Sequence, residues 1–183
     1  MTSPAVELAD LLTSRIRDVP DYPKPGVLFK DIAPLLADAE AFAALTRALA
    51  ERARALGATK VVGLEARGFV LAAPAAFAAG LGFVPIRKKG KLPGEVHAQS
   101  YELEYGSATL EVQCDAFTPG ERVLVVDDVL ATGGTIGASL DLVRRAGGVP
   151  AGVVVLMELG FLEGRAALAP HLDGAPLETL VEV

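Results

Sequence analysis

Two adjacent carboxylates followed by a run of small and hydroxylated residues could do chemistry in this sequence. Asp127 and Asp128 come directly after the apolar run 123–126, and threonines and glycines follow them. Main-chain N–H groups in such a loop, with a helix N-terminus behind them, form a cradle for an anion, and glycine lets a phosphate approach the backbone. The residues of this predicted phosphate cradle are Ala131, Thr132, Gly133, Gly134 and Thr135.

The acidic pair limits what the cradle could bind. Two carboxylates repel a bare phosphate, so Asp127 and Asp128 are explained if they bind sugar hydroxyls, or if they hold through water a Mg²⁺ ion carried by the ligand. A plainer interpretation stays open, in which the pair caps the next helix. The run is neither a Walker loop nor a Gly-x-Gly-x-x-Gly dinucleotide loop.

Strands and helices alternate around this run. Apolar segments at 60–64, 83–87, 122–126 and 151–158 predict strands, and helices are expected from near Asp38 to Gly57, at 67–80 and at 134–146. Strands that are apolar throughout are typical of a parallel sheet covered on both faces. We therefore expect an α/β fold with a central, mostly parallel sheet flanked by helices.

Two regions depart from this alternation. After an amphipathic helix at 8–16, the prolines and glycine of 19–34 exclude a regular helix or a central strand, so residues 1–34 should form a small N-terminal hood. Period-two segments at 100–105 and 108–112 around Gly106 predict a β-hairpin. The polar stretch 92–100 lacks periodicity and suits a mobile lid, which gives a core at 35–183 with a flexible lid at about 90–112, in a single domain overall.

Composition excludes some partners and compartments. The 183 residues carry a net charge of −6, which argues against nucleic acid or an anionic membrane as a partner. The single cysteine, Cys114, cannot close an internal disulfide, and the uncharged stretch 69–86 is interrupted by prolines and glycines, so we expect a cytoplasmic protein without a membrane span. His97 and His171 are expected at the surface, and no spacing suggests a zinc site.

The strand, acidic pair and Thr-Gly-Gly-Thr of residues 123–135 resemble the phosphoribosyl-pyrophosphate signature of the type I phosphoribosyltransferase family. The segments 20–32, 63–69, 86–94 and 101–106 also occur, in the same order, in adenine-specific members of that family, and the similarity extends from about Ile16 to residue 170. The resemblance implies purine salvage, in which adenine and 5-phosphoribosyl 1-pyrophosphate give AMP and pyrophosphate, with Mg²⁺ as cofactor.

The resemblance also implies roles for the basic residues. Pyrophosphate leaves with growing negative charge, which the site must bind with donors and metal. The family uses the loop Glu65, Ala66, Arg67 against pyrophosphate, and Arg87, Lys88 and Lys91 form a second cationic cluster. The arginine of that cluster reaches the neighbouring subunit's site in the family, so a homodimer is expected in which Arg87 acts across the interface.

Adenine is expected against Val27, Leu28, Phe29 and Lys30, where Phe29 offers a flat contact and main-chain groups read the base edge. Family members often have Arg in place of Lys30, and Val in place of Leu28. The resemblance assigns Glu104 the proton transfer at purine N7, and Tyr105 a place over the ribose or in the lid. Glu104, Arg67 and Arg87 are thus the expected catalytic residues.

Two other functions are alternatives to an adenine-specific transferase. One is a transferase for another purine, xanthine or hypoxanthine, but such enzymes often place Lys or Asp where Ala131 follows Asp128 by three positions. The other is a non-catalytic regulator that senses phosphoribosyl pyrophosphate. Such proteins usually carry a DNA-binding domain, for which the first 19 residues are too few and the net charge of −6 has the wrong sign.

Overall fold

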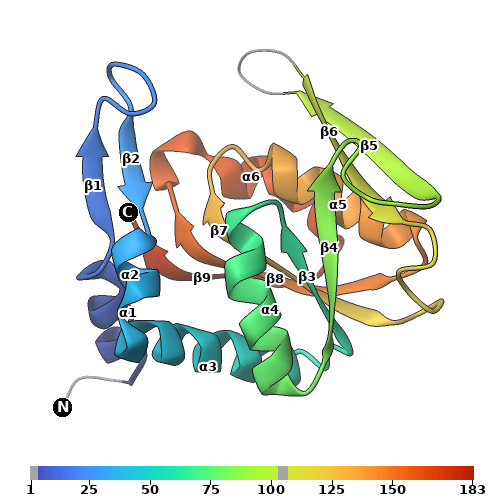
Figure 1. The fold of residues 1–183 in the computed structure, drawn as a ribbon, viewed down its shortest axis with the longest axis horizontal. Coiled ribbons are helices and arrows are strands. Elements are labelled where there is room, and N and C mark those ends of the chain that lie inside the picture. The colour runs from blue at the N-terminus through green and yellow to red at the C-terminus, as the bar shows by residue number, and fades with distance from the viewer. Residues whose placement is uncertain (1–3, 103–106) are drawn as a thin grey trace. The chain divides into compact units, whose positions relative to one another are not determined.

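The structure, a computed structural model, describes residues 4–102 and 107–183 (Figure 1). The chain divides into two compact units, with the boundary between Ala48 and Leu49. The helix α3 (Ala39–Ala55) crosses this boundary.

The first unit holds two short helices and a separate two-stranded sheet. Helix α1 (Pro4–Thr13) comes first, then strands β1 (Arg17–Pro20) and β2 (Leu28–Asp31), which pair antiparallel, and helix α2 (Ala33–Ala37). Ion pairs Arg17–Asp31 and Lys30–Asp18 join the two strands. Asp38 caps α3, because its Oδ1 accepts from the N–H groups of Glu40 and Ala41.

The second unit is built on a mixed sheet. Within the described residues its seven strands have the order β5-β6-β4-β3-β7-β8-β9. The pairs among β4, β3, β7, β8 and β9 are parallel, whereas β6 is antiparallel to both β4 and β5. The strands are β3 (Lys60–Leu64), β4 (Gly82–Lys88), β5 (Val96–Glu102), β6 (Ser107–Gln113), β7 (Arg122–Leu130), β8 (Val149–Glu158) and β9 (Leu177–Glu182).

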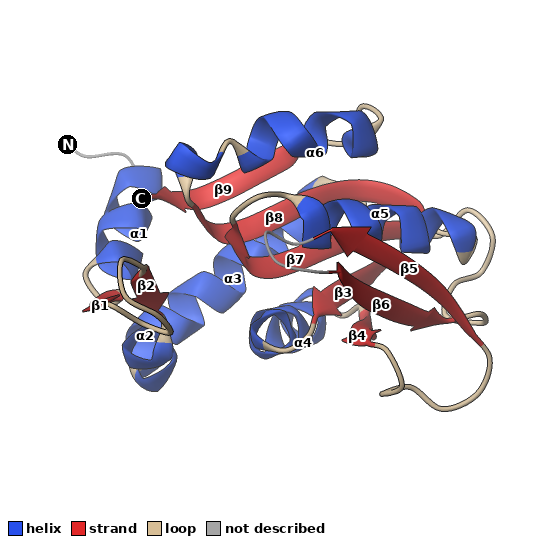
Figure 2. Cartoon of the chain, turned by 90° about the horizontal axis from the view of Figure 1, so that it is seen from above, coloured by secondary structure: helices blue, strands red, loops and turns tan. Residues whose placement is uncertain are grey.

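Helices cover both faces of this sheet. Helix α4 (Arg67–Ala79) packs on β3, β4 and β7 from one side, and α5 (Gly134–Arg145) and α6 (Gly164–Leu172) lie on the other, as Figure 2 shows from above. A short 3₁₀ turn (Gly160–Leu162) precedes α6. The central strand β7 is buried from Val123 to Asp128, because it has a parallel neighbour on each edge and a helix on each face.

This topology places a switch point between β3 and β7. The connection β3–α4–β4 leaves toward one edge of the sheet, and β7–α5–β8 leaves toward the other. Ligands of open α/β sheets bind at the carboxyl ends of the strands at such a point. The loops after β3 and β7 are therefore the natural walls of a site.

The predicted fold class is confirmed, as are the four main strands and the helices 38–57, 67–80 and 134–146. The antiparallel pairing of the predicted hairpin strands is also confirmed, with Ser100 opposite Thr109, whereas the predicted turn at Gly106 lies outside the described residues. The expectation of irregular structure at 92–100 is wrong from Val96 onward, because that backbone pairs with β6 and Arg145 donates a hydrogen bond to the Ala98 carbonyl. The segment 19–34 contains the end of β1, all of β2 and the first two residues of α2, all outside the central sheet.

Candidate active site

A cavity of about 530 Å³ lies at the carboxyl ends of β3 and β7, inside the second unit. Its lining combines carboxylates, cations and the glycine-threonine loop with an apolar side. The lining residues are Glu65, Ala66, Arg67, Lys88, Tyr101, Ala108, Leu110, Asp127, Asp128, Val129, Leu130, Ala131, Thr132, Gly133, Thr135 and Ile136. The structure thus brings together the acidic pair, most of the predicted cradle and part of the predicted cationic set.

The acidic pair lies within β7, two residues before the strand ends, rather than after it as the sequence suggested. Asp127 Oδ1 accepts a hydrogen bond of 2.9 Å from the Asp128 N–H. Burial raises the pKa of Asp127 well above its usual value, and the charge of Asp128 raises it further. Two adjacent buried carboxylates favour a ligand that brings positive charge or donor groups.

Asp128 faces a cation across the cavity wall. Its buried Oδ2 lies 2.9 Å from Arg67 Nη2, and the two groups form an ion pair. No group of the described residues donates a hydrogen bond to this oxygen. Burial raises the pKa of Asp128, and the Arg67 guanidinium opposes that rise. Arg67 begins α4, and the next residue, Gly68, lets the helix approach β7: a Cβ there would lie 2.8 Å from Asp127 Oδ1.

The loop after β7 leads directly into α5. Gly133 is the N-cap of α5 with φ of +86°, and no side chain caps this helix start in the described structure. The interpretation in which Asp127 and Asp128 cap the helix is therefore wrong. Thr135 Oγ1 donates a hydrogen bond of 3.1 Å to the Tyr101 hydroxyl, so strand β5 touches the first turn of α5.

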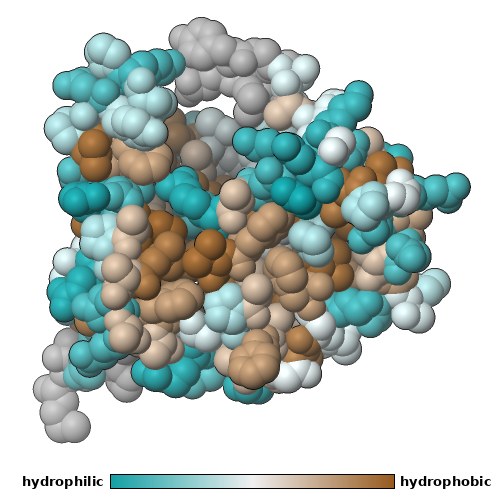
Figure 3. Space-filling model, in the orientation of Figure 1, coloured by the Kyte–Doolittle hydropathy of each residue, from teal (hydrophilic) through white to brown (hydrophobic). Residues whose placement is uncertain are grey.

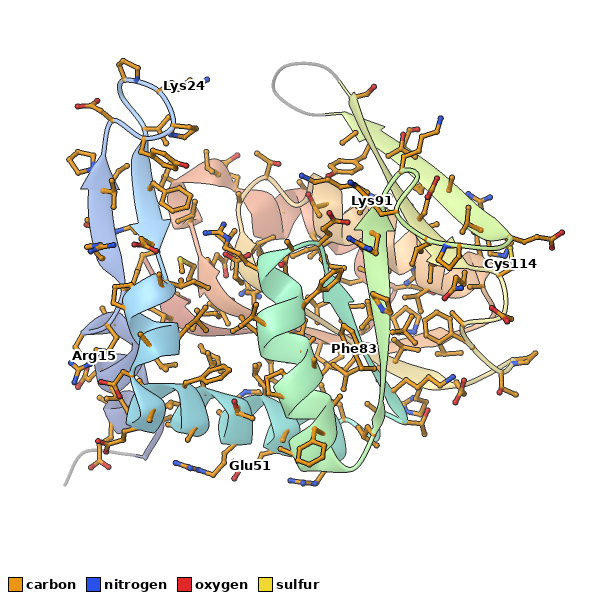
Figure 4. All side chains as sticks on the ribbon, viewed as in Figure 1. Arg15, Lys24, Glu51, Phe83, Lys91 and Cys114 are labelled. Carbon is orange, nitrogen blue, oxygen red and sulfur yellow. The ribbon has the colours of Figure 1, made fainter. Side chains whose placement is uncertain are left out.

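The predicted basic residues separate into two groups. Arg67 and Lys88 line the cavity, whereas Arg87 and Lys91 are outside the lining found for the described residues. Arg87 Nε donates to Glu65 Oε2 at 3.1 Å and its Nη1 donates to the Lys91 carbonyl, while the exposed Lys91 lies in the turn after β4 (Figure 4). Burial pushes the pKa of Glu65 upward, but hydrogen bonds from the Lys88 N–H and from Arg87 outweigh it and leave that pKa below its usual value.

The predicted adenine segment belongs to the first unit. Val27 donates its N–H to the Lys24 carbonyl and accepts from the Tyr22 N–H, so its main chain takes part in the turn between β1 and β2. Leu28 is exposed, and Phe29 meets Tyr22 edge to face with ring centroids 5.1 Å apart. Lys30 Nζ lies 2.8 Å from Asp18 Oδ1.

Two predicted residues, Glu104 and Tyr105, lie outside the described residues. Conversely, sequence reasoning missed six cavity residues, which are Tyr101, Ala108, Leu110, Val129, Leu130 and Ile136. Tyr101 belongs to the segment 101–106 that resembles the family. Its contact with Thr135, however, depends on β5 lying over α5, which no local pattern reveals. Cys114 is half-buried directly after β6 (Figure 4).

Comparison with known proteins identifies the family and the fold. The family model described as the phosphoribosyl transferase domain matches residues 34–171. The chain belongs to the phosphoribosyltransferase family. The matched range includes β3, α4, β7 and the loop into α5, which together build the cavity.

Relatives of known type match over nearly the full length. The adenine phosphoribosyltransferase of Streptomyces coelicolor is 68% identical over 183 residues, which is all of both chains. The solved adenine phosphoribosyltransferase of Rhodothermus marinus has a TM-score of 0.89 at 47% identity, and covers 97% of this chain and 99% of its own. The Saccharomyces cerevisiae enzyme, complexed with an imino-altritol bisphosphate and adenine, has a TM-score of 0.89 at 38% identity, covering 96% and 99%.

Among the described residues no helix is both long enough and apolar enough to cross a bilayer. The uncharged stretch 69–86 is divided between α4 and β4.

Proposed function

We propose that this chain is an adenine phosphoribosyltransferase of purine salvage, which converts adenine and 5-phosphoribosyl 1-pyrophosphate to AMP and pyrophosphate. The observation that carries the proposal is the cavity at the switch point, where a phosphate cradle, an acidic pair and cations meet in one wall. The full-length similarity to adenine phosphoribosyltransferases supports adenine as the base.

The sugar phosphate has a natural place in this cavity. The 5-phosphate binds the main-chain N–H groups and hydroxyls of the cradle, Ala131 to Thr135, and the ribose hydroxyls donate to Asp127 and Asp128. Pyrophosphate binds to the loop Glu65, Ala66, Arg67 and to Lys88, with Lys91 nearby and Arg87 coming from a neighbouring subunit. The cations then act where negative charge grows as the leaving group departs.

Mg²⁺ fits the acidic side of this site. Asp128 Oδ2 is a buried carboxylate oxygen that accepts no hydrogen bond from the part of the chain that the structure describes, and oxygen ligands are those that Mg²⁺ prefers. The described residues contain no group of three or more His, Cys, Asp or Glu that could hold a metal by themselves. Asp127 and Asp128 would therefore hold through water an ion that arrives with the substrate, where it supplies charge neutralisation for pyrophosphate.

The base is read and the proton handled by residues other than those of the phosphate cradle. Val27 to Lys30 contact adenine, with Phe29 against the ring, and Tyr105 packs over the ribose or the lid. The bond from ribose C1 to the pyrophosphate oxygen breaks and its electron pair leaves with pyrophosphate, while adenine N9 forms the new bond to C1. The proton that the purine loses passes from N7 to Glu104.

The proposal includes a homodimer in the cytoplasm. Two large apolar side chains on α4, Val70 and Phe77, are 43% and 88% exposed, which is typical of a face that another protein covers. In Figure 3 the surface over α4 is largely apolar. The cytoplasm is proposed because both the phosphorylated substrate and product are charged and do not cross a bilayer unaided.

An activity panel tests the proposal. The purified protein is mixed with phosphoribosyl pyrophosphate, Mg²⁺ and adenine, guanine, hypoxanthine or xanthine, and nucleotide formation is followed by chromatography. We expect AMP from adenine and much slower turnover of the oxopurines, because Ala131 offers no charged side chain to read a 6-oxo group. Equal turnover of hypoxanthine, or none of adenine, would refute the assignment, and binding without turnover would favour a sensor.

A further inference from the structure

The start of α6 lies directly against the phosphate cradle, with main chain touching main chain. A Cβ on Gly164 would overlap the carbonyl oxygen of Ala131 and lie 2.9 Å from its carbonyl carbon. From the other side, a Cβ on Gly133 would lie 2.7 Å from the Gly164 carbonyl oxygen. Gly133 and Gly164 therefore face each other where the loop after β7 crosses the start of α6. Because neither residue has a Cβ, the two main chains can come into direct contact.

The start of α6 is itself held from two strands. The single N–H of Arg165 Nε is shared between both oxygens of the Glu158 carboxylate at the end of β8, and Nη2 donates a further hydrogen bond to this carboxylate at 2.5 Å. On β9, the same guanidinium donates to the Leu177 carbonyl and the Thr179 hydroxyl. Leu168, fully buried, packs in the same core cluster as Leu130 and Ile136. This segment is therefore a fixed support, not a loose neighbour of the cradle.

We infer that Gly164 is a positioning residue for the phosphate cradle: the main chain at the start of α6 forms a back wall that sets where residues 131–133 present their N–H groups to a sugar phosphate. The inference rests on the proposed function for the identity of that ligand. The two atoms nearest to a Cβ on Gly164 belong to the Ala131 backbone, and only the third, Leu130 Cδ1 at 3.2 Å, is in a side chain, so no side-chain rotation makes room for a methyl group. Because α6 is anchored by Arg165 and Leu168, the cradle has to move instead.

A displaced cradle weakens one substrate and spares the other. Hydrogen bonds to phosphate depend steeply on donor position and angle, so misplaced N–H groups lose affinity for the 5-phosphate. Adenine, which binds elsewhere in the proposed function, is unaffected by the cradle. The signature of this role is a change confined to sugar-phosphate binding.

The test compares Gly164→Ala with Gly160→Ala, a matched control from the same segment. A Cβ at Gly160 meets nothing within 4 Å. We expect Gly164→Ala to raise the KM for phosphoribosyl pyrophosphate by about tenfold or more, with the KM for adenine and kcat within about threefold of wild type. Calorimetric binding of ribose 5-phosphate, which needs no turnover, should weaken by a similar factor, while Gly160→Ala matches wild type in every measurement.

Three outcomes would overturn the inference: unchanged ribose 5-phosphate binding in Gly164→Ala, equal losses in both variants, or equal losses for adenine and the sugar phosphate. If Gly164→Ala does not fold, Arg165→Ala decides, because it loosens the support without touching the cradle. That variant should raise the KM for phosphoribosyl pyrophosphate by about threefold, and Arg165→Lys should restore part of the loss; an unchanged KM overturns the inference. If wild type binds ribose 5-phosphate but does not use adenine, the proposed function fails and the binding comparison still stands.

Discussion

Asp127 and Asp128 are the two acidic residues whose charged forms the described structure disfavours, since both side chains are buried and both have raised pKa values. The Arg67 guanidinium offsets part of the charge on Asp128, yet within the described residues Asp128 Oδ2 accepts no hydrogen bond. A ligand that brings hydroxyl donors, or an ion with its water, offers hydrogen bonds to the carboxylate oxygens of both residues. We therefore expect the pair to select a sugar phosphate over a bare phosphate.

Glu104 is the residue on which the proposed proton transfer depends. We expect Glu104→Ala to lower kcat by about a hundredfold, the usual contribution of a general acid or base, while the KM for phosphoribosyl pyrophosphate changes by less than about threefold. Steady-state kinetics with both substrates varied measure the two constants. Glu102→Ala, two positions earlier, is the control and should keep wild-type kcat. An unchanged kcat in Glu104→Ala would remove the residue from the mechanism.

For single residues, the sequence could predict those site residues that are neighbours along the chain. The cradle and the acidic pair lie in one run, so their meeting required only a strand followed by a helix. Tyr101 and Thr135 are 34 positions apart, and their hydrogen bond exists because β5 packs across α5. The sequence pointed to Gly164 only as one residue of the segment that resembles the family. Its contact with Ala131 could not be predicted, because it arises where the start of α6 crosses the loop after β7.

Among the elements, long apolar strands and well-capped helices could be predicted. Strands β3, β7 and β8 are apolar runs that end in turn residues, and α3 has its Asp38 cap and a glycine after its last turn. Helix α6 was missed because it is short and contains Pro170. Strand β9 alternated Leu177, Thr179 and Val181 on one side, a signal that could have found it.

Glu158 links three of these elements and gives stability its own pH dependence. Hydrogen bonds from Arg165, joined by one from Thr179, outweigh burial and hold the pKa of Glu158 below its model-compound value of 4.5. A lowered pKa stabilises the folded state above the unfolded value, and this stabilisation is lost as the pH falls through the folded value. We expect Glu158→Gln to lower the free energy of unfolding by about 1 kcal/mol at pH 7 and to lower Tm by about 2–4 °C.

The pH series is the diagnostic measurement for this variant. Thermal melts of wild type and Glu158→Gln should converge below about pH 4, where the wild-type carboxylate is protonated as well. The exposed Glu51 on α3 serves as control, and Glu51→Gln should follow wild type closely. A stability difference that stays constant from pH 7 to acid would show that shape, not charge, is what Glu158 contributes.

For the whole molecule, the proposed dimer makes a prediction about shared sites. Arg87→Ala and Asp128→Ala chains should each be nearly inactive alone. If Arg87 serves the neighbouring subunit, a mixed dimer holds one intact site, so an equal mixture that exchanges subunits should regain about a quarter of wild-type activity. The measurement is AMP formation after the two variants are refolded together.

The matched control mixes Asp128→Ala with Asp127→Ala, two lesions in the same chain's cavity wall. In that mixture every site carries one lesion, so no activity should return. Absence of recovery in the Arg87 mixture, with subunit exchange shown by mixed tags, would contradict a site shared between subunits. Recovery in both mixtures would contradict the assignment of the two carboxylates to one site.

The contact between Gly164 and the cradle also has a consequence for how the protein is made. The cradle is encoded at 131–135, but its support comes from α6 and from β9, near the end of the chain. During translation the complete signature motif leaves the ribosome before the residues that fix its shape. A product truncated before Gly164 would therefore contain every residue of the phosphate motif and still lack a formed binding site, so substrate binding reports on completed synthesis.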